Sequence, residues 1–177
     1  LMAACLFALN ADYLNIQGAA VQMFNHGINI AGMWILVGIL EHRLGTQDLR
    51  EMGGVAKIAP YFTVALVLIS LANIALPLTN GFVGEFMMFN ALFTSPTTFH
   101  VWMTVLAGLG VILSAVYTLS MVQKVAYGEL NPKTNQFGDL KLNEKLILIL
   151  IMVLILVLGF YPKPVLDLVS LTGINLN

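Results

Sequence analysis

The sequence predicts an all-α integral membrane protein with about four transmembrane helices and the end of a fifth. Its composition and its hydropathy pattern lead to this prediction. Hydrophobic residues make up 59% of the 177 residues and charged residues only 10%, whereas a soluble domain carries roughly 25% charged residues. Apolar runs long enough for helices of ~20 residues recur along the chain, without the alternation of an outer-membrane strand. We expect one membrane domain over residues 1–177.

The expected elements follow the hydropathy in chain order. They are the end of a helix at 1–9, a complete span at 16–40, a broken span at 58–93, two further spans at 100–127 and 144–161, and a tail at 162–177. The chain begins at Leu1 inside an apolar stretch that has neither the basic start nor the cleavage site of a signal peptide. We therefore expect the sequence to be a fragment of a longer protein.

Residues 58–93 could form either two helices in a hairpin or one crossing with a break. Pro77 and Gly81, followed by Gly84, place the interruption near 77–81. The piece after it, 81–93, would be ~20 Å long, which is too short for a hydrocarbon core of ~30 Å. The length of this piece favours one broken crossing.

The charge distribution tests the same choice independently. One broken crossing puts the loops 41–57 and 124–145 on the same side of the membrane, and these loops hold seven of the eight Lys and Arg residues. A hairpin would split those residues three against four. Because basic residues concentrate on the cytoplasmic side, we predict one broken crossing, with both loops cytoplasmic and the C-terminus on the opposite side.

The chain lacks the signatures of several other functional classes. Its net charge is −1 and it has no basic stripe, which argues against a nucleic-acid partner. Cys5 is the only cysteine, and the three histidines lie far apart, without the spacing of metal ligands. The Gly-rich motifs that bind nucleotide phosphates are missing as well. We therefore expect neither a metal nor a cofactor in this chain.

Glu85 is the only charged residue between Lys57 and Lys124. A lone carboxylate in an apolar segment costs free energy, and such residues are usually functional. Desolvation favours the neutral acid, so this carboxyl group would be poised to take up and release a proton near neutral pH. Transporters also build ion sites at breaks in helices. The alternative is a buried Glu that pairs with a distant Lys and only locks the packing.

His26 is the second candidate, and it lies in the first complete span. It stands beside a polar face made by Gln22, Asn25, Asn29 and Gly32. A polar face on a membrane helix should contact protein or water rather than lipid. The histidine is therefore either a proton relay near neutral pH or a packing residue with satisfied hydrogen bonds.

Lys124 is the third candidate, and it ends a span with a polar stripe of Ser114, Tyr117 and Thr118. It is either the cytoplasmic end of a proton path or a lysine that snorkels to the membrane interface. The sequence favours snorkelling, because Lys near the end of a membrane helix commonly does so.

Several runs of the sequence together resemble one protein family. They are residues 18–27 (GAAVQMFNHG), 36–38 (LVG), the glycine pair 53–54 ahead of Pro60, 75–86 (ALPLTNGFVGEF) and 158–162 (LGFYP). The family comprises the antiporter-like, proton-conducting membrane subunits of respiratory complex I, which are related to multisubunit sodium/proton antiporters and membrane-bound hydrogenases. Most of these subunits carry Lys at the Glu85 position. Glu at that position is typical of the subunit M type, called subunit 4 in mitochondria.

The resemblance implies a fold of fourteen helices with two inverted five-helix repeats. This chain would hold the end of helix ten and helices eleven to fourteen, of which helix twelve is the discontinuous one. The resemblance further implies that Glu85 is the key carboxylate of the second half-channel and His26 its histidine. Lys124 falls where the family carries basic or polar residues.

The resemblance also implies a function and a location. The intact subunit would translocate protons as part of an NADH:quinone oxidoreductase in a bacterial inner membrane, or alternatively in the mitochondrial inner membrane. Its partners would be neighbouring membrane subunits and the lipid bilayer, while other subunits would bind NADH, flavin, iron–sulfur clusters and quinone. Two alternatives are a subunit of an Mrp-type antiporter or membrane-bound hydrogenase, and a non-conducting structural subunit.

Overall fold

The computed structural model describes residues 13–96 and 98–171, so the helix end expected at 1–9 lies outside the described residues. In this part of the chain all regular structure is helical. The elements are α2 (Tyr13–Leu44), η1 (Leu49–Glu51), α3 (Val55–Ile58), α4 (Pro60–Asn73), α5 (Asn80–Thr94), α6 (His100–Ala126), η2 (Thr134–Gln136), α7 (Leu142–Phe160) and α8 (Lys163–Leu171), where η marks a short 3-10 helix.

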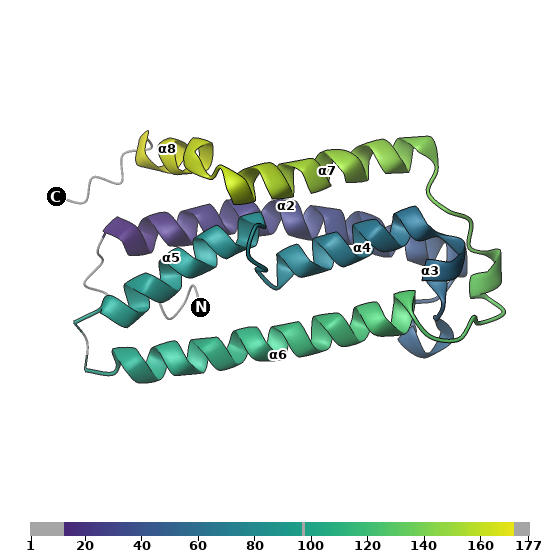
Figure 1. Cartoon of the computed structure of the whole chain (residues 1–177), viewed down its shortest axis with the longest axis horizontal. Coiled ribbons are helices and arrows are strands. Elements are labelled where there is room, and N and C mark those ends of the chain that lie inside the picture. Colours follow the sequence, from purple (N-terminus) through teal and green to yellow (C-terminus); the bar gives the residue numbers. More distant parts are fainter. Residues whose placement is uncertain (1–12, 97, 172–177) are drawn as a thin grey trace.

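In the part of the chain that the structure describes, three long helices and one interrupted pair of shorter helices make up the bundle. Helices α2, α6 and α7 each contain a stretch that is long and apolar enough to cross a membrane. Helices α4 and α5 have only 14 and 15 residues, or ~22 Å each. They lie end to end, with the break at 74–79 between them, and together run along the bundle (Figure 1). The helical structure within 58–93 is therefore interrupted, at 74–79.

The two loops that are rich in basic residues lie at the same end of the bundle (Figure 1). One loop connects α2 to α4 and the other connects α6 to α7. The turn between α5 and α6 lies at the opposite end, together with α8. This is the arrangement that one broken crossing requires.

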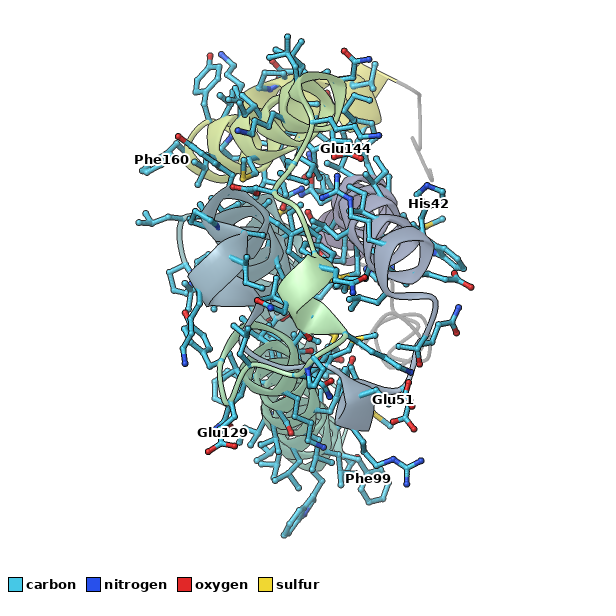
Figure 2. All side chains as sticks on the ribbon, turned by 90° about the vertical axis from the view of Figure 1, so that its right-hand side faces the viewer. His42, Glu51, Phe99, Glu129, Glu144 and Phe160 are labelled. Carbon is cyan, nitrogen blue, oxygen red and sulfur yellow. The ribbon has the colours of Figure 1, made fainter. Side chains whose placement is uncertain are left out.

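Polar contacts tie the two loops together at that end, which faces the viewer in Figure 2. Arg43 forms an ion pair with Glu144 and donates a hydrogen bond to the Asp139 carbonyl (3.1 Å). Lys133 forms an ion pair with Glu51 (Nζ–Oε2 2.8 Å), and this contact holds the pKa of Glu51 below its ordinary value. The first pair joins the end of α2 to the start of α7, and the second joins one loop to the other, so both stabilise this end of the bundle.

Helix α4 ends in a Schellman motif. The N–H of Leu76 donates to the Leu71 carbonyl (3.0 Å) and the N–H of Ala75 donates to the Ala72 carbonyl (3.1 Å), which is the hydrogen-bond pattern of that motif. Ala75 has φ +54°, in the left-handed region that glycine adopts most easily. The helix therefore stops before Pro77, and the break begins earlier than the expected 77–81 because an alanine takes the usual place of glycine.

Helix α5 begins after a second strained residue. Leu78 has φ +78°, and Thr79 follows in an extended conformation as the N-cap residue. The Thr79 side chain does not cap α5. Its hydroxyl donates instead to the Leu76 carbonyl (2.7 Å) inside the break. Two residues at positive φ in one short segment mean that the surrounding helices hold the break in shape.

The main apolar core lies between α2, α4, α6, α7 and the loops. Its fully buried members include Leu36, Phe62, Leu66, Leu148 and Ile155. Many other large apolar side chains point outward, including those of Trp34, Leu113 and Leu150, which are 72%, 66% and 61% exposed. Such an apolar exterior suits hydrocarbon rather than water.

The segment expected to be a tail contains helix α8. Pro162 ends α7, and its carbonyl accepts hydrogen bonds from the N–H groups of Val165 and Leu166. Pro164 falls in the first turn of α8, where proline is tolerated. Val165 is buried against Val21 of α2. The prolines therefore separate two helices rather than end the ordered chain.

Candidate functional site

The polar face of α2 packs against the discontinuous helix. The close contacts advance regularly along both elements: Gly18 lies against Met87 and Met88, Gln22 against Gly84, Asn25 against Asn80, Asn29 against Ala72, and Gly32 against Ile69. Asn25 and Asn29 are only 1% and 2% exposed. The prediction that this face contacts protein rather than lipid is therefore confirmed.

Gly81 and Gly84 do not form the break but lie inside α5. A Cβ atom at position 81 would lie 2.6 Å from the Ala72 carbonyl oxygen. A Cβ atom at position 84 would lie 2.5 Å from Oε1 of Gln22 and 2.9 Å from its Cα. Of the three residues expected to make the break, only Pro77 lies within it. The two glycines instead allow neighbouring backbones to approach α5 closely.

Glu85 lies less than two turns into α5, between two cavities. A cavity of about 390 Å³ is lined by Glu85 with polar side chains of three other helices: Gln22 and His26 of α2, Asn73 of α4, and Ser114, Tyr117 and Thr118 of α6. The second cavity, of about 350 Å³, touches Glu85 and Ser114 but is otherwise apolar. The carboxylate is half-buried, so it borders both spaces.

His26 and Glu85 thus share one cavity, although 59 positions separate them in the chain. Gln22 and Asn73 line the same cavity, and the amide oxygen of each is buried with no hydrogen-bond donor among the described residues. Buried acceptors in a polar cavity of this size are typical positions for bound water. The cavity can therefore support a hydrated connection between the histidine and the carboxylate.

The ion pairs found among residues 13–96 and 98–171 are Arg43–Glu144, Arg50–Asp48 and Lys133–Glu51. None of these pairs involves Glu85. Within this part of the chain, the carboxylate therefore lacks the lysine partner that a purely structural role would require.

Lys124 is not brought to this cavity. It is exposed near the end of α6, and it is absent from the linings of both cavities that contain Glu85. Met121 of α6 is the residue of that region that does line the polar cavity. The position of Lys124 agrees with a side chain that reaches the membrane interface.

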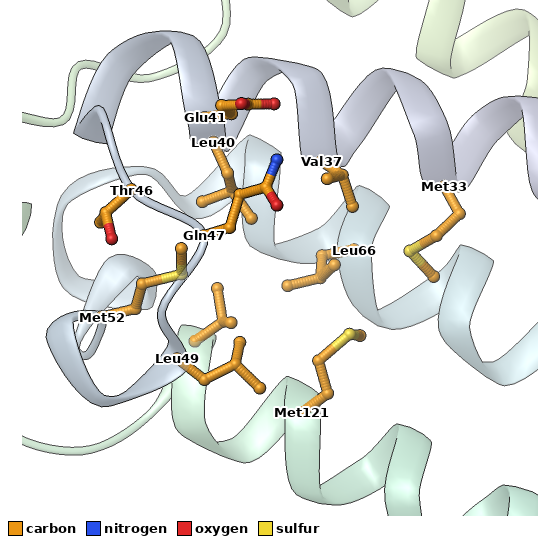
Figure 3. Close-up of a pocket in the computed structure, with 11 residues that line it drawn as sticks. Met33, Val37, Leu40, Glu41, Thr46, Gln47, Leu49, Met52, Leu66 and Met121 are labelled. Carbon is orange, nitrogen blue, oxygen red and sulfur yellow. The ribbon is translucent and has the colours of Figure 1, made fainter.

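The sequence analysis missed several lining residues. Ala107 and Gly110 of α6 line the second cavity, and the small residues at 107, 108 and 110 were the available signal. Met33 and Met121 line the polar cavity and also a third cavity of about 270 Å³ at the loop end (Figure 3). In Figure 3 the two methionines lie at one side of this third cavity, with Gln47 and Met52 at the other. Met33 and Met121 are therefore the residues that the linings of both cavities share.

Comparison with known proteins places these features in a family. A family model described as NADH:quinone oxidoreductase/Mrp antiporter, TM, matches residues 1–114. The chain is 33% identical over 166 residues to NADH-quinone oxidoreductase subunit M of Rhodobacter capsulatus, which covers 93% of this chain and 31% of that protein. It is 35% identical over 167 residues to the protein of the same name from Escherichia coli (strain K12), with 91% and 32% covered.

The chain spans about a third of the length of the curated relatives it matches. Its fold is similar to that of a chain in the structure of respiratory complex I from Thermus thermophilus with bound NADH. The TM-score is 0.78 at 26% sequence identity, over 94% of this chain and 35% of that one. The chain therefore belongs to the family of membrane proteins described as NADH:quinone oxidoreductase/Mrp antiporter, TM.

Proposed function

We propose that the chain is part of a proton-translocating membrane subunit of an NADH:quinone oxidoreductase, of the subunit M type. The names of its relatives support this proposal. The observation that carries it is the placement of Glu85, which follows a break in a membrane helix and borders a polar cavity shared with His26. A carboxylate in such a place can exchange protons with water that enters the cavity.

In this proposal Glu85 takes up and releases the transported proton. His26 passes protons to or from the cavity, because an imidazole can do so near neutral pH. Lys124 is the least supported of the three candidates, since it lies outside the cavity. To act at the loop end of the proton path, it would need water or other residues that connect it to the cavity.

The remaining parts of the enzyme belong to partners. NADH, flavin, iron–sulfur clusters and quinone would be bound by other subunits, and this chain would carry out no redox step itself. Neighbouring antiporter-like membrane subunits and lipid would cover its apolar exterior. The location would be a bacterial inner membrane, with the mitochondrial inner membrane as the alternative.

A second candidate function is transport in an Mrp-type antiporter or a membrane-bound hydrogenase. The description of the matching family, which names both the oxidoreductase and the Mrp antiporter, keeps this candidate open. Co-purification separates these candidates. An NADH:quinone oxidoreductase subunit should purify together with flavin and iron–sulfur subunits, an antiporter subunit with neither, and a hydrogenase subunit with subunits that do not oxidise NADH.

The decisive experiment replaces Glu85 with Gln in the full-length subunit of the assembled complex. Glu85→Gln preserves the shape of the side chain but removes the group that titrates. We expect proton pumping driven by NADH oxidation to be lost in membrane vesicles while the complex still assembles. Glu129→Gln, at an exposed loop position, is the matched control and should pump normally. Normal pumping by Glu85→Gln would refute the assigned role.

A further inference from the structure

Two buried asparagines of α2 each bind one half of the discontinuous helix. Nδ2 of Asn29 donates to the carbonyl of Ala72, in the last turn of α4 (3.2 Å). Nδ2 of Asn25 donates to the carbonyl of Asn80, the first residue of α5 (2.8 Å). Helix α2 therefore binds both the end of α4 and the start of α5.

The contact with α5 is reciprocal. While Asn25 binds the Asn80 carbonyl, Nδ2 of Asn80 donates to the backbone carbonyl of Asn25 (3.3 Å). Asn80 is fully buried and Asn25 is 1% exposed, so water does not compete for these bonds. Two hydrogen bonds in opposite directions fix both the distance and the register between α2 and α5 at this point.

The contact with α4 has a different cause. The carbonyl groups in the last turn of a helix have no partner further along that helix. The Schellman motif supplies a donor to Ala72 from Ala75, and Asn29 adds a second donor from outside the helix. The end of α4 is therefore anchored to α2 as well as to the break.

The position of these bonds relative to the site gives them a consequence. Asn25 is the chain neighbour of His26, and Asn80 lies five residues before Glu85 in the same helix. A shift of α5 along α2 would thus change the separation between the histidine and the carboxylate directly. The strained segment 74–79 does not fix this separation alone, because Ala75 and Leu78 are held at positive φ by their surroundings.

We propose that Asn25 and Asn29 are positioning residues, through which α2 holds α4 and α5 in place on either side of the break. They set the distance over which Glu85 and His26 exchange protons through the shared cavity. This inference rests on the proposed function for its effect on transport, but the hydrogen-bonded link from α2 to α4 and α5 is a property of the fold. Besides Glu85 and His26, Tyr117 is the titratable side chain among the described residues that line this cavity.

The test uses Asn25→Ala, Asn29→Ala and Asn80→Ala in the full-length subunit of the assembled complex. We expect proton pumping to slow by roughly 10-fold, because small misplacements of reacting groups have effects of that size or more. The pH profile of pumping should also shift, and in the same direction for Asn25→Ala and Asn80→Ala, because each removes one bond of the reciprocal pair. Asn90→Ala, at an exposed position of α5, is the control and should change neither quantity.

Hydrogen exchange of the peptide that spans the break provides a readout that does not depend on proton transfer by Glu85. We expect faster exchange around residues 72–84 in the three variants and parental exchange in Glu85→Gln. If Asn25→Ala does not assemble, Asn25→Ser carries the same expectation, because its hydroxyl is too short to reach the Asn80 carbonyl. Parental pumping, pH profile and exchange in Asn25→Ala would refute the positioning role of the asparagines, even if Glu85→Gln abolishes pumping. Faster exchange in the asparagine variants together with normal pumping by Glu85→Gln would instead refute the role of Glu85, while supporting the link that the asparagines make from α2 to α4 and α5.

Discussion

Gly84 sets how closely α2 approaches the helix that carries Glu85. The space that a side chain at position 84 would need is filled by Gln22, whose backbone Cα would lie 2.9 Å from an added Cβ atom. A flexible side chain can turn away, but a backbone atom of a packed helix cannot. The position next to the carboxylate therefore admits glycine only, and this close packing brings Gln22 to the same cavity as Glu85.

Gly84→Ala is expected to destabilise the subunit by about 1–3 kcal/mol, the usual effect of overpacking. The midpoint of thermal unfolding of the purified complex, or the amount of complex that assembles, measures the change. Gly108→Ala is the control, because a Cβ atom there meets no atom within 4 Å, and alanine favours a helix by about 1 kcal/mol over glycine. Equal stability of the two variants would show that α2 and α5 are not in close contact in the assembled subunit.

The two main candidate residues were chosen from the sequence because polar groups stand out in an apolar chain. Glu85 and His26 both have this contrast with their surroundings, and the structure places both on one cavity. Glycines carry no such contrast. The same residue type can end a helix or allow a close approach, and only the neighbouring element decides between these roles. The sequence therefore suggests that Gly81 and Gly84 belong to the break, although they pack inside α5.

At the scale of single elements, α4 depends on a cap that comes from a distant loop. The helix begins at Pro60, and its N-cap residue, Ala59, has no side chain that could accept a hydrogen bond. The Asp139 carboxylate supplies the acceptor instead, taking hydrogen bonds from the N–H groups of Tyr61 (3.3 Å) and Phe62 (3.2 Å). A carboxylate at this end of a helix also interacts favourably with the helix dipole.

Asp139→Ala should remove this cap and destabilise the start of α4 by about 1 kcal/mol. Faster hydrogen exchange at Tyr61 and Phe62 in the assembled complex is the expected measurement. Asp167→Ala serves as a comparison, since Asp167 is exposed on α8 at the other end of the bundle. If exchange at the start of α4 is unchanged in Asp139→Ala, the loop does not cap the helix in the native complex.

The presence of a break is predictable from the length of the helical pieces, but the residues at which the break begins and ends are not. A piece too short to cross the membrane implies a discontinuous crossing, whichever residues form the break. The limits depend on Ala75 and Leu78 at positive φ, and neither residue type signals that conformation. Helix α8 was not predicted from the sequence, for a related reason. Two prolines near its start indicate the end of helical structure, whereas proline in a first turn also begins a helix.

At the scale of the whole molecule, charge and length together determine the topology. The positive-inside asymmetry favours one broken crossing without any knowledge of the path of the chain, and both basic loops lie at one end of the bundle. The contacts that join these loops, such as Lys133–Glu51, could not be predicted. They depend on how two separate loops fold over the same surface, and hydropathy contains no information about that.

The arrangement of the loops predicts which positions can be reached from each side of the membrane. Single cysteines at Gln47 and Asn135, in the full-length subunit with Cys5 replaced, should react with a membrane-impermeant maleimide from the cytoplasmic side only. Both positions are exposed and lie in the two basic loops. A cysteine at Thr98, in the exposed turn between α5 and α6, should react only from the opposite side. Intact cells and inverted vesicles separate the two cases. Labelling of 47 and 135 from different sides would require α4 and α5 to form a hairpin, which would remove Glu85 from the middle of a single crossing.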